Sequence, residues 1–184
     1  MALPLRYTGT AIALHWLAAL LVFAAFPLGL YMGDLPFSPL KLRLFSYHKW
    51  LGVTVFLLAA VRLAWRAAHR APPFPPSMPS WERFAAAAAH WLLYALIFVI
   101  PLTGWLMSSA KGMQTVYLGV VPLPDLLGKD KALGRLLQDT HAALNMAMLA
   151  LVAFHIVAAL RHHFVERDGI LARMLPFLDK ESSR

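Results

Sequence analysis

The 184-residue sequence contains no cysteine and has few charged residues. The absence of cysteine excludes disulfides, thiolate-bound zinc, iron–sulfur clusters and haem attached through a C-x-x-C-H motif. Any redox group must therefore be held without covalent bonds to sulfur. Charged residues make up 14% of the chain, hydrophobic residues make up 60%, and the mean hydropathy is +0.61. The hydrophobic content exceeds what the core of a soluble protein needs. We therefore predict an integral membrane protein that contacts lipid and has no nucleic-acid partner.

Four apolar stretches are long enough to cross a bilayer, which requires about 20 residues. A proline-rich segment at 71–79 separates the second stretch from the third, and Pro27 is expected to kink or break the first. A short surface helix is expected around Leu133, Leu136 and Leu137. We predict an all-α integral membrane four-helix bundle, a single domain over 1–184, with spans at about 11–32, 44–65, 84–107 and 139–160, an outer loop at 108–138 and a cytoplasmic tail at 161–184.

Four spans place both termini on the same side of the membrane. That side, which includes the connection between the second and third spans, carries ten lysines and arginines, and the opposite side carries seven. The positive-inside rule therefore predicts a multi-pass protein with both termini in the cytoplasm.

Two histidines in the fourth span, His141 and His155, are fourteen residues apart. Fourteen helical residues return to within about 40° of the starting direction and rise about 21 Å, so both imidazoles face one side at different depths. Because the spans alternate in direction, His48 shares the outer level with His141, and His15 and His90 share the inner level with His155. Ionisable side chains in hydrocarbon are costly and indicate function.

Paired neutral imidazoles on different helices are what a six-coordinate haem iron requires, and helix bundles build such sites in their cores. A lone histidine would also be explained by hydrogen bonding between helices. A zinc site is disfavoured because the span cores contain no acidic residue. Gly52, one turn after His48, leaves room for a macrocycle, and Arg62 reaches the inner level, where it can pair with haem propionates.

These motifs resemble those of the bacterial cytochrome b561 proteins, which are small four-helix membrane cytochromes. The resemblance rests on Ala11-Ile12-Ala13-Leu14-His15-Trp16, His48 with Gly52, Val61-Arg62-Leu63, His90 with Pro101 and Gly104, the His141/His155 pair and His162-His163. It implies a four-helix bundle in the bacterial inner membrane with two non-covalent haems b. By resemblance, His15 and His155 bind the inner iron, and His48 and His141 bind the outer iron.

Two further histidines have open roles. His90 matches a family histidine that is not a ligand, and geometry alone does not exclude ligation; we favour a supporting or quinone-side role. His162 continues the face of His155 toward the cytoplasm, where it is expected to meet a propionate or a quinone headgroup, or else to lie in a solvated helix end.

The resemblance implies oxidation of superoxide at the outer haem and delivery of electrons to ubiquinone, that is, a superoxide:quinone oxidoreductase. The outer segments carry seven cations and four acids, a surplus of three that would attract a small anion. Lys49, adjacent to His48, is the candidate cation nearest the outer haem, although these lysines are also typical of solvated loops. Two alternatives are a non-catalytic cytochrome b subunit relaying electrons between the quinone pool and a periplasmic or dehydrogenase partner, and a haem-free proton or metal pathway.

Overall fold

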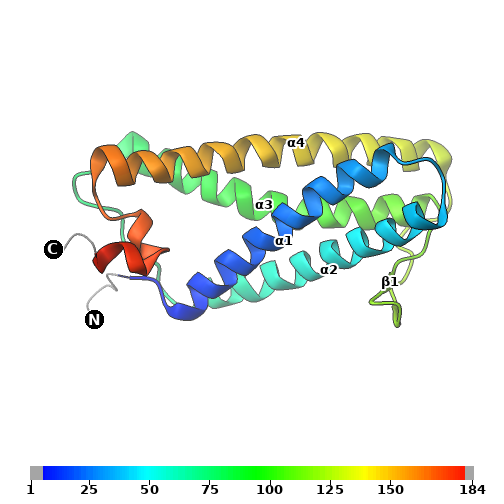
Figure 1. Cartoon of the computed structure of the whole chain (residues 1–184), viewed down its shortest axis with the longest axis horizontal. Helices are drawn as coiled ribbons and strands as arrows, with labels where there is room; N and C mark the ends of the chain where they lie inside the picture. Colours follow the sequence, from blue (N-terminus) through cyan, green and yellow to red (C-terminus); the bar gives the residue numbers. More distant parts are fainter. Residues whose placement is uncertain (1–5, 181–184) are drawn as a thin grey trace.

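The structure is a computed structural model that describes residues 6–180, the last two without their side chains. Within this range, four helices are long and apolar enough to cross a membrane, as predicted for an all-α membrane bundle (Figure 1). The helices are α1 (Gly9–Asp34), α2 (Pro39–Ala68), α3 (Ser80–Ala110) and α4 (Lys131–Arg161). The short elements are β1 (Val116–Tyr117), β2 (Val121–Pro122), η1 (His162–Glu166), η2 (Leu171–Arg173) and η3 (Pro176–Lys180).

The helices run up and down in sequence order, so both chain ends lie at the same end of the bundle (Figure 1). We call this the terminal end; it also holds the α2–α3 connection. The opposite end, the loop end, holds the α1–α2 and α3–α4 connections. Helix α1 packs mainly on α2 and helix α3 mainly on α4, with a smaller contact between α2 and α3. The bundle is therefore two antiparallel helix pairs, α1–α2 and α3–α4, that face each other.

Polar residues at the helix starts explain where three of the helices begin. The hydroxyl of Thr8 accepts a hydrogen bond from the backbone N–H of Ala11, and Ser38 caps α2 in the same way. The Asp130 carboxylate accepts from the backbone N–H groups of Ala132 (2.8 Å) and Leu133 (3.0 Å). Such caps satisfy backbone donors that have no partner inside the helix.

Helix α4 begins at Lys131, eight residues before the predicted start of the fourth span at 139. The predicted separate surface helix was wrong, because those residues form the first turns of α4. Hydropathy detects the part of a helix that crosses hydrocarbon, whereas this helix starts at its Asp130 cap in the polar zone. Gly134 is buried here, and a Cβ would lie 3.0 Å from Cγ of Lys111. It permits close packing of α4 on the end of α3 and does not break the helix.

Helix α1 continues through Pro27, so this proline does not break the helix. The α3–α4 connection, 111–130, contains a β-hairpin that was not expected from the sequence. In this hairpin Val116 pairs with Pro122, and Tyr117 pairs with Val121. It lies against α2, because Trp50 Nε1 donates to the carbonyl of Val116 at 2.7 Å.

Few side chains are buried between the two helix pairs. In the described parts of the four helices, no buried side chain is larger than methionine; examples are Ala18, Val55, Ala59 and Met148. A helix bundle that closes on itself fills its core with large interdigitating side chains. The large residues here face outward or line the space between the pairs, and this space positions the candidate site.

Replacing Asp130 with alanine should lower the free energy of unfolding by about 1 kcal/mol, because two backbone N–H groups of α4 lose their acceptor. Unfolding in mixed micelles, followed by circular dichroism, measures this change. The matched variant Asp130→Asn keeps a capping oxygen without the charge and should retain most of the stability. An asparagine variant as unstable as the alanine variant would mean that the charge of Asp130, and not its cap, stabilises the helix.

Candidate functional site

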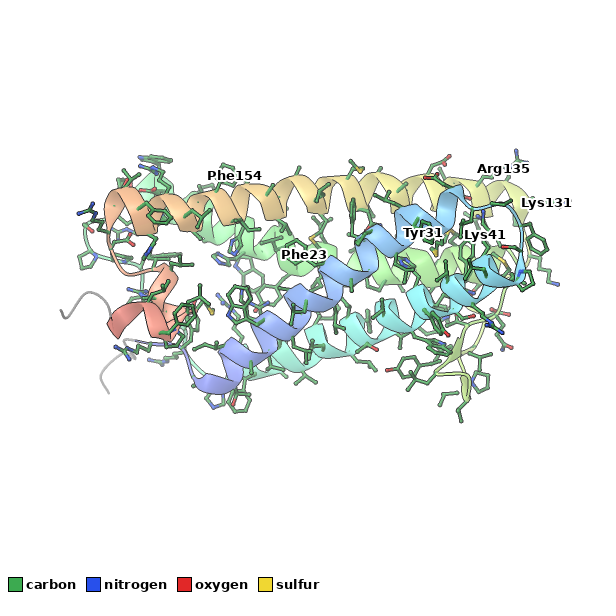
Figure 2. The ribbon with its side chains drawn as sticks, in the orientation of Figure 1. Phe23, Tyr31, Lys41, Lys131, Arg135 and Phe154 are labelled. Carbon is green, nitrogen blue, oxygen red and sulfur yellow. The ribbon has the colours of Figure 1, made fainter. Side chains whose placement is uncertain are left out.

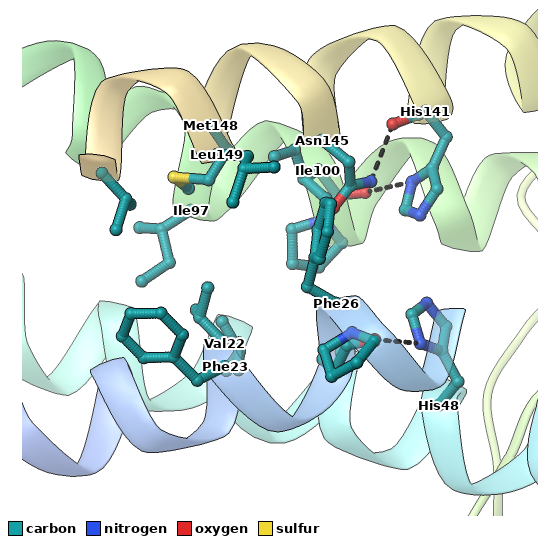
Figure 3. Close-up of a pocket in the computed structure, with 16 residues that line it drawn as sticks. Val22, Phe23, Phe26, His48, Ile97, Ile100, His141, Asn145, Met148 and Leu149 are labelled. Carbon is teal, nitrogen blue, oxygen red and sulfur yellow. Dashed lines mark hydrogen bonds between the residues drawn. The ribbon is translucent and has the colours of Figure 1, made fainter. Parts of the chain in front are cut away.

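Near the loop end, two histidines from different helix pairs face each other. His48 lies on α2 and His141 on α4, and their ring centroids are 6.2 Å apart with planes at 82°. Figure 3 shows the two imidazoles pointing toward each other across the space between the pairs. The sequence predicted that these two residues share one level, and the structure brings them together.

The hydrogen bonds of these rings determine which nitrogen is free. His48 Nδ1 lies 3.1 Å from the carbonyl of Ala25, and His141 Nδ1 lies 3.0 Å from the carbonyl of Ile100. A carbonyl oxygen can only accept, so we place a proton on Nδ1 of each ring. The neutral imidazoles then keep the Nε2 lone pair for a ligand, the arrangement typical of metal-binding histidines. The hydroxyl of Thr103, 3.1 Å from His141 Nδ1, donates to Ile100 and supports the same tautomer.

A largely apolar cavity adjoins the two rings. It is lined by aliphatic and aromatic side chains together with Gly52, and it encloses ≈ 760 Å³ including the part open to the surroundings. An apolar lining with a few polar groups at its edge is typical of a site for an apolar ligand. A Cβ on Gly52 would meet nothing within 4 Å, so this glycine borders open space beside His48. Asn145, also in the lining, donates from Nδ2 to the His141 carbonyl at 2.7 Å and so fixes its own side chain.

Two glycines make room for the imidazoles. A Cβ on Gly29 of α1 would lie 3.0 Å from Cε1 of His48, and a Cβ on Gly104 of α3 would lie 3.2 Å from Cε1 of His141. Each distance is shorter than ordinary van der Waals contact. Each ring therefore packs against a glycine of the partner helix in its own pair, which limits its rotation.

Toward the terminal end, three histidines meet. His15 of α1 and His155 of α4 have ring centroids 6.4 Å apart and planes at 66°, while His90 of α3 lies 5.3 Å from His155. His90 Nδ1 is 2.6 Å from the carbonyl of Ala86 in its own helix. Among the described residues, His15 Nδ1 is the buried side-chain polar atom without a hydrogen-bond partner. A buried unpaired nitrogen is costly and indicates that this ring has a role other than packing.

The donor geometry fits a haem iron. A metal–imidazole bond is about 2.0 Å long, so two imidazoles on opposite sides of one ion have ring centroids about 6.3 Å apart. The His48–His141 and His15–His155 separations agree with this value, and both join the two helix pairs. The 5.3 Å separation of His90 from His155 is shorter, and both lie in the α3–α4 pair.

The described residues include no group of three or more histidine, cysteine or acidic side chains placed to hold a metal ion directly. Two imidazoles fill only two coordination positions of a metal ion, so another group must fill the rest. A porphyrin, which occupies four positions and leaves two axial ones, satisfies that requirement.

Arg62 lies at the level of the terminal-end histidines, as the sequence predicted. Its guanidinium is 5.2 Å from the ring centroid of Tyr94, and Arg66 lies 5.7 Å from the same ring. Arg62 is also close enough to His15 and His155 to act on them electrostatically. Two arginines stacked near one tyrosine provide a positive environment for an anionic group such as a propionate.

His162 is 8% exposed, which contradicts the solvated helix end, one of the two alternatives for this residue. Its Nδ1 is 2.7 Å from Oδ2 of Asp168, and its Nε2 faces Oε1 of Glu82 at 3.7 Å. Arg161 binds the same Glu82 and also Glu166. Because carboxylates engage both ring nitrogens, the position of His162 points to a structural role that ties the C-terminal segment to α3.

Lys49 is engaged at the loop end and not free. Its Nζ donates to the carbonyl of Met113 at 2.8 Å, which ties the α3–α4 connection to α2 beside His48. Lys111 donates to Gln138; burial lowers the pKa of Lys111 below its ordinary value, and Asp139 opposes this shift. Lys131 and Arg135 also lie at this end (Figure 2).

Sequence reasoning missed Gly29, Thr103, Asn145 and the carbonyl acceptors of the two histidines. One signal was available, because the first and third spans each carry a proline followed within three residues by a glycine, Pro27 with Gly29 and Pro101 with Gly104. In the structure Gly29 lies against the His48 ring and Gly104 lies against the His141 ring.

Comparisons with known proteins agree with this geometry. Residues 6–177 match the family model described as prokaryotic cytochrome b561. The chain is 33% identical to Cytochrome b561 homolog 2 of Escherichia coli (strain K12) over 94% of its length and 92% of that protein's. It is 30% identical to Cytochrome b561 homolog 1 of the same organism, covering 93% and 97% of the two chains. It is 26% identical to the Probable superoxide oxidase CybB of Yersinia pestis, covering 93% and 96%. The chain therefore belongs to the prokaryotic cytochrome b561 family, membrane electron-transfer proteins that bind b-type haem.

Proposed function

We propose that the chain holds two haems b, one at each histidine level, and passes electrons between them across the membrane. The observation that carries this proposal is the pair of separations of 6.2 Å and 6.4 Å between imidazoles from opposite helix pairs. Helix α4 supplies one histidine to each level, so it would hold one ligand of each haem. Bound haem would supply one-electron redox chemistry.

In this proposal His48 and His141 hold the loop-end iron, and His15 and His155 hold the terminal-end iron. His90 is given a supporting role, because by resemblance it matches a histidine that is not a ligand, and because its ring is too close to His155, on the same helix pair, for the two to share one iron. It packs edge-on against the His155 ring and restricts that ring's orientation. Arg62 would compensate the charge of the propionates of a haem bound at the terminal end.

The protein side chains control access and charge. The Nδ1 bonds of His48 and His141 to backbone carbonyls fix both rings, so these side chains would move little when a bound haem gains or loses an electron. The apolar lining of the loop-end cavity would keep water away from a haem bound there. Burial of this kind, together with ligand identity, sets the potential of a haem.

We infer that superoxide is the electron donor at the loop end and ubiquinone the acceptor. Two superoxide anions each lose one electron and become O₂, and one ubiquinone takes both electrons and two protons to become ubiquinol. Two facts support this donor: a relative is named Probable superoxide oxidase, and the loop-end segments carry seven cations against four acids. A surplus of positive charge attracts a small anion and raises its encounter rate.

The same proposal orients the protein in the bacterial inner membrane. The loop end faces the periplasm and both termini face the cytoplasm, because the terminal end carries ten lysines and arginines against seven at the loop end. We place the ubiquinone headgroup near His90 and Arg62, where its protons come from the cytoplasmic side.

The ligand assignment predicts haem content. His48→Ala should remove the loop-end haem and leave the other, lowering the ratio of haem to protein from two to one. The matched variant His90→Ala should keep both, since His90 is not a ligand. Pyridine haemochrome analysis of purified protein measures the ratio. Two haems in the His48 variant, or one in the His90 variant, would contradict the assignment.

Gly52 gives an independent test of where the loop-end macrocycle lies. Gly52→Leu should lower haem content at this level, because the added side chain enters the cavity that Gly52 borders. Gly33→Leu is the control, since Gly33 also has open space around its Cβ position but does not line the cavity. Full haem content in the Gly52 variant would place the ring elsewhere.

Stopped-flow measurement of haem reduction by superoxide tests the donor. The purified protein alone should react rapidly, and the rate should fall with added salt and several-fold in Lys49→Glu, because charge attraction is screened or reversed. Arg70→Glu, a charge reversal at the opposite end, should leave the rate unchanged. A slow reaction that requires a second protein would favour the relay-subunit alternative. A rate independent of salt would remove the case for electrostatic attraction.

A further inference from the structure

The tip of the β-hairpin in the α3–α4 connection is apolar and exposed. Leu118 is 57% exposed, Val120 is 78% exposed and Val121 is 51% exposed. Only Gly119 interrupts this run, so the segment from Leu118 to Val121, the hairpin tip, presents hydrocarbon to its surroundings. A contiguous exposed apolar patch on a connection marks a contact surface.

Leu118 has a strained backbone conformation, which suggests that its side chain is needed at this position. Leu118 has φ of 54° and Gly119 has φ of 74°, so both central residues of the turn are left-handed. Such turns favour asparagine, aspartate or glycine at the first central position, where a bulky residue is unfavourable. Strain of this kind persists where the surroundings stabilise it and points to function.

The hairpin is held beside the membrane-spanning part of α2. Trp50 Nε1 donates to the Val116 carbonyl at 2.7 Å, and the hydroxyl groups of Thr54 and Tyr117 are 3.0 Å apart. Thr54 lies near the middle of α2, so the hairpin descends along the helix from the loop end. Figure 1 shows β1 projecting sideways from α2 and not outward along the bundle axis.

The hairpin tip satisfies much of its own backbone. The N–H of Gly119 donates to the Val116 carbonyl at 3.3 Å, and the N–H of Val120 donates to the Tyr117 carbonyl at 3.1 Å. Internal pairing of this kind is what a lipid environment demands, because hydrocarbon offers no partners to backbone groups. Trp50, Tyr47 and Tyr117 beside it are residues favoured at the boundary between headgroups and acyl chains.

We propose that the hairpin tip inserts into the lipid leaflet at the loop end, with Leu118, Val120 and Val121 at the boundary of headgroups and acyl chains. The inserted tip anchors the α3–α4 connection to the membrane. Lipid is the occupant because the tip lies beside Trp50, within the predicted second span (44–65), and projects away from the bundle (Figure 1). The proposal is independent of the haems and of the direction of electron transfer.

The absence of cysteine makes a direct test simple, because one introduced cysteine is the only labelling site. A spin label on Val120→Cys, in protein reconstituted into phosphatidylcholine vesicles, reports collisions with oxygen, which enters lipid, and with a nickel chelate, which stays in water. Labels on Phe154→Cys, on the exposed face of α4 (Figure 2), and on Arg70→Cys are the lipid and water references.

We expect the Val120 label to match the Phe154 label, with high oxygen access and loss of nickel access. High nickel access, as at Arg70, would place the tip in water and overturn the proposal. Low access to both probes would also overturn it, because the tip would then contact a protein, such as a second copy of the chain.

A second variant tests whether the tip side chains themselves cause insertion. The Val120 label in the Leu118→Asn/Val121→Asn background should gain nickel access, because the asparagine amides are costly to place in hydrocarbon. Asparagine also suits the left-handed backbone at position 118. Unchanged access would mean that the contacts with α2 alone hold the hairpin in place, and the anchor would be rejected. Circular dichroism of the same variant verifies that the four helices remain folded.

Discussion

The structure depends on placing neutral imidazoles from opposite helix pairs a fixed distance apart within an apolar bundle. A histidine in hydrocarbon is costly unless its ring nitrogens find partners. At the loop end the cost is offset on one side of each ring by a carbonyl, Ala25 for His48 and Ile100 for His141. The remaining nitrogen of each ring then faces the space between the pairs. The glycines beside the rings make room for them, and the small buried residues and the cavity leave space between the helix pairs.

The two histidine levels are supported differently, although α4 serves both. At the loop end, each ring packs against a glycine and bonds through Nδ1, so its orientation is set by the protein. At the terminal end, His15 Nδ1 has no partner, and His155 is bordered by His90 and the charge of Arg62. Hydrogen bonding to a ligand histidine raises the basicity of its imidazole. A nearby positive charge stabilises the reduced form of a haem and so raises its reduction potential. The unequal surroundings are a physical basis for unequal potentials at the two levels in the proposed electron path.

Periodicity and hydropathy were enough to predict four spans and the level of each histidine, because these follow from helical rise and alternating direction. They could not predict Gly29 or Thr103 as neighbours of the rings, since such contacts depend on how helices cross. The start of α4 was misplaced because a cap, and not hydropathy, decides where a helix begins. The hairpin was missed because Leu118 adopts a conformation that leucine rarely takes, and local preference predicts another residue there.

The loop-end connection and the loop-end histidine are mechanically joined. Lys49, next to His48, binds the carbonyl of Met113, and Trp50, one residue further along α2, binds the carbonyl of Val116. One turn of α2 therefore carries both an imidazole of the candidate site and the two attachments of the connection. Movement of the hairpin relative to the membrane would act on this turn directly. The hairpin and the candidate site are thus attached to the same turn of α2, and the proposed lipid anchor would hold the backbone that carries His48.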